Sequence, residues 1–400
     1  MDVLLLAIVF LAIIIVLFIF KKPLFMALIV SIILAILLYQ LSFADASKTI
    51  LSSLSSYTTI SVLLIFYLIT FIQRMMEHEK ALSKSQSSIA KLVNNRRIDA
   101  ALSPSFMGLL PSASAVYLAG SMVNASCQDD LSNEDKTFVT SYFRHAAESF
   151  LPTYPSIIIA VSLTGMNMNH FIIAMLPMVL TYVLLGYFFF LRKIPLDKRK
   201  EQVNYKVELM SLLKLLFPIV LVLVLILVFK IEAQYSALVV AIIYILYQRY
   251  TPKQIIGFAK SAFEAKVLVT TALIFIFKDL ITYTNVIEQL PPLFEQLPIP
   301  LFIIYGLIFF VGSLVLGNSG AAVIILPLAF AIVPDANLAF LVYLNSLGFI
   351  AMQIAPTHIC LHLACEYFKT NFSDLIKRTA PILIIFVIIA NLYYLLLNAF

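Results

Sequence analysis

Apolar runs close to the length of a bilayer crossing follow one another along nearly the whole chain. They cover residues 3–20, 24–41, 57–73, 151–165, 168–191, 209–229, 233–248, 264–281, 343–363 and 379–398. A helix needs about 20 apolar residues to cross the hydrocarbon core. Only 12% of the residues are charged, whereas soluble domains average about 25%. The runs predict an all-α polytopic protein of a cytoplasmic (inner) membrane, with about ten transmembrane helices.

Two further apolar stretches are interrupted by small polar residues. Residues 99–126 contain "LLPSASA", and residues 300–333 contain "LGNSGAA". The second stretch is too long for one straight span and too short for two spans with a loop. Lipid offers no hydrogen-bond partner to polar groups placed at its centre. We therefore expect two re-entrant hairpins, each made of two half-helices that meet at a polar tip.

The order of these segments recurs along the chain, which predicts two inverted repeats. Residues 1–192 form the first, with scaffold helices 3–41, hairpin 99–126 and broken helix 151–165. A cytoplasmic linker, 193–208, leads to the second, 209–400, with scaffold helices 209–248, hairpin 300–333 and broken helix 343–363. Amphipathic stretches at 46–57 and 252–263 occupy matching positions. Weakly repeated halves of this kind are typical of secondary transporters.

Positive charge decides between re-entrant and crossing hairpins. If both hairpins return to the side from which they enter, 24 of the 27 Lys and Arg residues lie on one side. If both cross, 13 lie inside and 14 outside. Lys and Arg near span ends strongly prefer the cytoplasm. The bias favours the re-entrant arrangement, with an odd number of crossings in each half and both chain termini outside.

Short polar residues at the two tips and at the proline breaks are the candidate substrate or ion ligands. At the tips, half-helix N-termini would aim free N–H groups at an anion, and unwound carbonyls can hold Na⁺. Ser112 and Asn318 are the candidate ligands of a Na⁺ ion. The alternative is that such residues only mediate close helix packing. The tip and break candidates are Ser112, Ser114, Asn318, Ser319, Gly320, Thr153 and Thr357.

Ionisable residues are sparse near these breaks. Arg144 and Glu148 lie in "YFRHAAESF", expected as an interfacial helix before Pro152. At this spacing the two can pair on one helix face, or Arg144 can hold the carboxylate of a substrate. His358 follows Thr357 and could carry a proton, or it could be structural.

The chain lacks the usual signatures of several other protein classes. It has no phosphate-binding glycine loop and no basic, aromatic surface for nucleic acid. The three cysteines form no disulfide framework or zinc pattern. We therefore expect no enzyme activity and no cofactor besides a coupling ion, Na⁺ or H⁺. Two rival interpretations remain: an ion channel, and an intramembrane serine protease in which Ser319 of "GNSG" is activated by His358 or His362.

Three motifs carry a family resemblance: "SPSFMGLLPSASAVYLAGSMV", "YFRHAAESFLPTYPSIIIA" and "IAPTHICLHLACEYFK". Together they resemble an uncharacterised family of archaeal and bacterial integral membrane proteins. That family is similar to the ion transporter superfamily, which includes gluconate, C4-dicarboxylate and divalent-anion symporters. The resemblance implies an elevator-type transporter for a small organic anion, commonly a homodimer, with a scaffold and a mobile domain that carries both hairpins.

The two tips depart from the pattern of those relatives. Gluconate-type relatives tend to have Pro-Gly-Gly where this chain has Ser112-Ala113-Ser114. The second tip is closer to the Ser-Asn-Thr tips of sodium–carboxylate members, in a different order. Neither tip identifies the substrate.

Overall fold

The computed structural model describes residues 2–20, 22–93, 95–109, 115–195, 204–289, 298–334, 336–356 and 358–399. These residues form helices joined by short turns, and they contain no β-sheet. Five helices are long and apolar enough to cross a membrane. They are α4 (Tyr57–His78), α10 (Met168–Phe189), α11 (Tyr205–Leu227), α16 (Leu301–Ile332) and α19 (Phe372–Ala399). The protein is therefore a helical membrane protein.

The remaining helices are shorter and fall in the order that the apolar runs predict. In the first half they are α1 (Asp2–Ile14), α2 (Leu24–Leu38), α3 (Phe43–Ser55), α5 (Ala81–Val93), α6 (Arg96–Met107), α7 (Ala115–Cys127), α8 (Asn133–Arg144) and α9 (Pro155–Thr164). In the second half they are α12 (Ala233–Gln248), α13 (Pro252–Ala262), α14 (Ala265–Tyr283), α17 (Leu338–Met352) and α18 (Ile359–Phe368).

The two amphipathic stretches are the helices α3 and α13, and side chains define where they begin. The Ser42 hydroxyl accepts a hydrogen bond from the Asp45 amide at the start of α3. Thr251 and Gln254 form a reciprocal capping box at the start of α13. Such caps satisfy amides that have no partner inside the helix. Helix α3 begins three residues before the expected stretch because Ser42, rather than a later residue, provides the cap.

Helix α16 is folded back on itself at Gly317. This residue has φ +74° and ψ 163°, a conformation that is open to glycine and costly for other residues. A Cβ on Gly312 would lie 2.5 Å from Ile325 Cδ1, whereas 13 residues of straight helix span about 20 Å. Residues 301–316 and 318–332 are thus antiparallel half-helices. The bend falls within the "LGNSGAA" interruption, where the sequence predicts a tip.

The first hairpin consists of α6 and α7, whose distal ends are held together by polar contacts. Ser126 Oγ donates to Asp99 Oδ2 at 2.5 Å, and Arg96 Nη2 lies 2.5 Å from Asp130 Oδ2. Ser103 donates to the other oxygen of the buried Asp99. Its expected tip, residues 110–114, lies outside the described residues.

The segment before Pro152 differs from the sequence-based expectation. Instead of an interfacial helix, α8 is buried from Lys136 through Arg144. Its alternating polar residues suggest a water-facing helix, but α6, α7, α18 and α19 enclose it. The expected broken span, 151–165, is therefore only the second part of an interrupted helix. Helix α8 is the first part.

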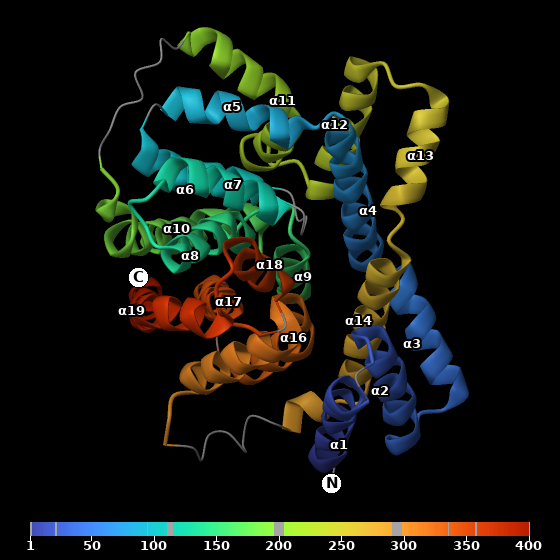
Figure 1. The fold of residues 1–400 in the computed structure, drawn as a ribbon. Coiled ribbons are helices and arrows are strands. Elements are labelled where there is room, and N and C mark those ends of the chain that lie inside the picture. The colour runs from blue at the N-terminus through green and yellow to red at the C-terminus, as the bar shows by residue number, and fades with distance from the viewer. Residues whose placement is uncertain are drawn as a thin grey trace.

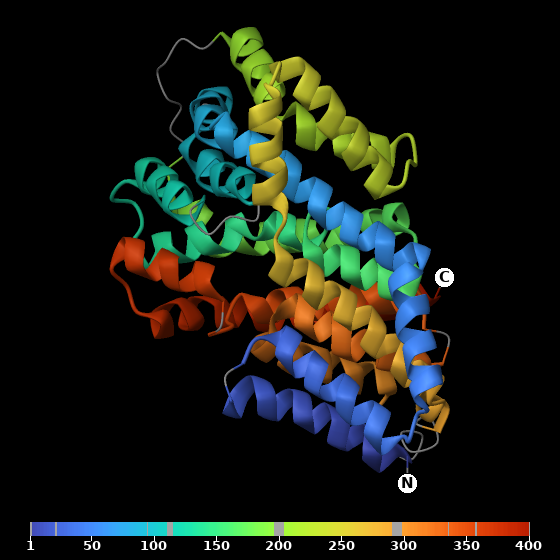
Figure 2. The same ribbon diagram turned by 90° about the vertical axis from the view of Figure 1, so that its right-hand side faces the viewer.

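The helices are arranged in two groups. In Figure 1, α1 to α4 and α12 to α14 form a column on the right, and α6 to α10 with α16 to α19 lie on the left. In Figure 2 both chain ends lie on the same side of the molecule. Within the second group, α8 and α10 are joined by a symmetric pair of hydrogen bonds. Each of the hydroxyls of Tyr142 and Tyr182 donates to the other residue's carbonyl at 2.7 Å.

Candidate functional site

Two interrupted helices meet in the second group. The first break, residues 145–154, separates α8 from α9 and includes the short η2 (Ala146–Ser149). The second break, residues 353–358, separates α17 from α18. Both interruptions contain prolines, which have no N–H and clash with the preceding turn of a helix. The rings of His145 and His358 lie 4.6 Å apart, so the two breaks are in contact.

An amide on α17 makes a second link between the breaks. Asn345 Nδ2 donates to the Ser149 carbonyl at 2.9 Å. The Asn345 side-chain oxygen is also 3.5 Å from Asn318 Nδ2, just beyond the bend of α16. The second hairpin therefore joins the junction of the breaks.

Arg144 lies at the end of α8 with its side chain buried, at 3% exposure. Its Nη1 donates to His145 Nε2 at 3.3 Å and lies 3.6 Å from Cys360 Sγ. A guanidinium can only donate, so His145 Nε2 must accept and His145 Nδ1–H donates to the Ser141 carbonyl. His145 is therefore the neutral tautomer in this arrangement. The spacing of Arg144 and Glu148 allows an ion pair on one helix face, but no such pair occurs among the described contacts.

Among the described residues, four of the ten buried polar side-chain atoms without a hydrogen-bond partner lie around these breaks. They are Asn318 Oδ1 and Ser313 Oγ at the second hairpin, Thr153 Oγ1 in the first break and Gln353 Nε2 in the second. Each such atom costs roughly 1–3 kcal/mol if it stays unpaired. This concentration is the strongest sign that the region binds a polar ligand.

Gly348 leaves room for two of these atoms. A Cβ at this position would lie 2.4 Å from Asn318 Oδ1 and 2.8 Å from Ser313 Oγ. Both oxygens therefore pack directly against the Gly348 backbone, and only a glycine permits so close an approach. Hard cations such as Na⁺ prefer oxygen ligands, so the second tip offers suitable donors. The other expected Na⁺ ligand, Ser112, lies outside the described residues.

The predicted site residues are only partly brought together. Arg144, Thr153, Asn318 and His358 lie at or beside the junction, whereas Ser112, Ser114 and Thr357 lie outside the described residues. Ser319 is half-buried and Gly320 is buried beside Leu316. No hydrogen bond between Ser319 and either His358 or His362 occurs among the described contacts. His362 Nε2 instead lies 2.8 Å from the Pro356 carbonyl.

Donor atoms of His145, His358 and Cys360 all lie within 4.8 Å of one another. Two imidazoles and a thiol are common ligands of soft transition metals. The Arg144 guanidinium, however, lies against two of the three donors. Its permanent positive charge opposes a cation there, so the trio does not fit a metal ion in this arrangement.

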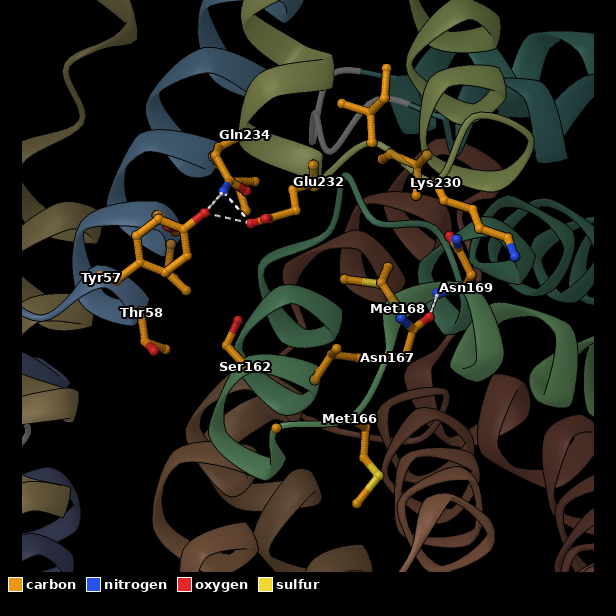
Figure 3. A pocket seen from close by; sticks show the side chains of 18 residues that line it. Tyr57, Thr58, Ser162, Met166, Asn167, Met168, Asn169, Lys230, Glu232 and Gln234 are labelled. Atoms are coloured by element: carbon orange, nitrogen blue, oxygen red, sulfur yellow. Dashed lines mark hydrogen bonds between the residues drawn. The ribbon is translucent and has the colours of Figure 1, made fainter.

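A polar pocket of about 410 Å³ lies between the two groups of helices. It is lined by the start of α4, the α9–α10 turn and the α11–α12 turn, as Figure 3 shows. Tyr57 donates to Glu232 at 2.6 Å, and Gln234 donates to both. Lys230 also lines this pocket. The pocket gives water-accessible polar surface beside α9, the helix that follows the first break.

Sequence reasoning missed several residues of the junction. Asn345, Gln353 and Ser313 carry no motif, but each is a polar residue inside an apolar run. In a membrane helix such residues face the protein interior. That signal was present in the sequence, although it does not tell which residues meet.

The chain matches one family model over residues 3–397, described as a protein of unknown function, DUF401. The chain belongs to the DUF401 family. A comparison with curated proteins found no match.

Proposed function

We propose that this DUF401 protein is a secondary active transporter for a small organic anion with a carboxylate group. One observation carries the proposal. Two broken helices and a hairpin bend bring buried, unpaired polar atoms together with the buried Arg144. Arg provides a planar fork of donors that suits a carboxylate. The Asn318, Thr153 and Gln353 side chains would add hydrogen bonds that fix the substrate's orientation.

Helix bounds support inverted repeats. Helices α8 and α17 start 205 residues apart, and α9 and α18 start 204 residues apart, as do α10 and α19. Helices α4 and α14 start 208 residues apart. Each half thus contains a helix pair, an amphipathic helix, a span, a hairpin and a broken helix in the same order. We infer ten crossings with two re-entrant hairpins.

Polar contacts between distant helix ends support the expected topology. On the proposed cytoplasmic side, Arg74 pairs with Glu264, Lys91 with Glu208 and Arg378 with Asp135. On the opposite side, Tyr39 donates to the Asp2 carbonyl and Asn337 to Asn398. The first set contains the arginines and lysines, which favour the cytoplasm. Both termini would then lie outside the inner membrane, on the side of the Tyr57–Glu232 pocket.

The division into two groups of helices supports an elevator mechanism. The scaffold would be α1 to α4 and α11 to α14, and the mobile domain α6 to α10 and α16 to α19. Both hairpins and both breaks would move with the mobile domain, in line with the resemblance to the ion transporter superfamily. Na⁺ or H⁺ would supply the driving force, without another cofactor, and the protein would act as a homodimer.

Uptake into proteoliposomes tests the proposal. The purified full-length protein is offered acetate, lactate, succinate, citrate and gluconate, with and without Na⁺ and pH gradients. We expect at least one carboxylate to accumulate and to exchange across the membrane. Asn318→Ala should reduce exchange, whereas Lys48→Gln, on the surface of α3, should not. If no carboxylate enters faster than into empty vesicles, the proposal is wrong.

A further inference from the structure

We propose that transport is coupled to protons and that Glu148 carries one proton with each anion. This inference rests on the proposed function, because it names the coupling ion of the same site. The proposed substrate site assigns no role to the carboxyl group of Glu148.

Glu148 lies in η2 within the first break, one helical turn after Arg144. The residue is half-buried. Among the described contacts, no hydrogen bond or ion pair reaches its carboxyl group. Its backbone N–H donates to the His145 carbonyl at 3.0 Å, and the ring of His145 packs 4.6 Å from that of His358. Polar groups in such positions usually have partners, so a carboxyl group without one requires an explanation.

A carboxylate that stayed ionised beside the anion site would repel an anionic substrate. Like charges at close range disfavour each other's ionised form. When Glu148 takes up a proton, this opposition disappears and the carboxyl group can donate a hydrogen bond. Proton binding and anion binding then favour each other by the same factor, as linkage requires. Such mutual dependence is what a symporter needs.

The other titratable groups near the first break are held by fixed contacts, so Glu148 and His358 are the pair that would exchange protons. Arg144 keeps its charge, and its contact with His145 Nε2 holds that ring neutral. From the other side of the break, Tyr154 donates to the Gly108 carbonyl. Tyr182 on α10 is bound to Tyr142.

Cys360, on α18, lies against Arg144. His358 Nδ1 is 3.3 Å from the Met352 carbonyl. A proton would enter from outside onto the Glu148 carboxylate, with His358 as its neighbouring acceptor, and leave to the cytoplasm after the anion has dissociated.

Glu148→Gln tests this directly, because glutamine keeps the size of the side chain but cannot release a proton. In proteoliposomes with the carboxylate panel, the wild type should accumulate substrate when the lumen is alkaline. The variant should lose gradient-driven accumulation by about 10- to 100-fold. Its substrate exchange should persist, because exchange of one anion for another needs no net movement of protons. Glu148→Asp should keep the coupling, and Glu366→Gln, on the exposed face of α18, should behave as the wild type.

A second measurement needs no variant. Adding a transported carboxylate to the wild type in weakly buffered detergent solution should remove one proton from solution for each anion bound. If binding removes no protons, or a Na⁺ gradient alone drives accumulation, Glu148 is not the carrier although transport stands. If the wild type neither accumulates nor exchanges any carboxylate, the proposed function fails and this inference fails with it.

Discussion

The two breaks contain the same proline–threonine pair but differ in chemistry. Pro152-Thr153 and Pro356-Thr357 are 204 residues apart. With this spacing, Arg144 corresponds to Gly348 and Glu148 to Met352. Arg144 and Glu148 thus place charges at the first break, whereas the corresponding positions at the second break are uncharged, and Gly348 lets Asn318 pack closely against α17. The comparison teaches that similar backbone interruptions can differ in role: in the proposed transporter the first would recognise charge, and the second would hold the second hairpin in close contact.

Replacing Arg144 should give the largest effect on activity. Arg144→Gln removes the fixed positive charge from the first break but keeps a donor group. Hydrogen bonds to charged groups contribute about 1.5–3 kcal/mol, so substrate affinity should fall roughly 10- to 150-fold. Substrate exchange in proteoliposomes measures this loss.

The matched change in the second break is Met352→Gln, at the position that corresponds to Glu148. It should alter exchange far less than Arg144→Gln. Equal losses in both variants would mean that the loss in Arg144→Gln does not come from the missing charge.

Adding a side chain at Gly348, on α17 before the second break, should destabilise the protein. A Cβ on Gly348 would lie 2.5 Å from Phe309 Cε1 as well as close to Asn318 and Ser313. Overpacking of this kind costs roughly 1–3 kcal/mol. Gly348→Ala should therefore lower the melting temperature in detergent. Gly257→Ala on α13, where a Cβ meets nothing within 4 Å, should leave it unchanged or slightly higher.

Ser319→Ala tests the hydroxyl beside the second tip. Loss of one neutral hydrogen bond costs about 1 kcal/mol, so we expect about a five-fold rise in the KM for transport. The same variant separates a transporter from a serine protease, in which turnover would cease altogether. Complete loss with an intact fold would contradict the transport interpretation.

The ion pair between Arg74 and Glu264 should matter least. Both side chains are about one-third exposed or more, and their atoms lie 2.7 Å apart. Exposed ion pairs contribute about 0.2–1 kcal/mol. Arg74→Gln should shift the melting temperature only slightly and leave substrate exchange intact. A large loss of transport would mean that a charge outside the first break is also required.

The sequence predicted the helices better than it predicted their environment. Lipid requires long apolar helices, so the apolar runs mark them, and the glycines of "LGNSGAA" mark the bend at Gly317. Helix α8 was misjudged because its polar residues contact other helices, such as Lys136 with Asn124, and not water. Arg144 and His358 were singled out as rare charges in an apolar chain. Asn345 and Gln353 were missed because only three-dimensional packing brings them to the breaks.

The reciprocal bonds between Tyr142 and Tyr182 have a mechanical consequence. They join α8, which ends at Arg144, to α10 at two points. A sliding motion of α8 along α10 would break both hydrogen bonds at once, so they hold Arg144 in place relative to α10. In the proposed elevator mechanism, a substrate bound at Arg144 would therefore keep the same protein ligands throughout the movement, instead of passing from one ligand to the next.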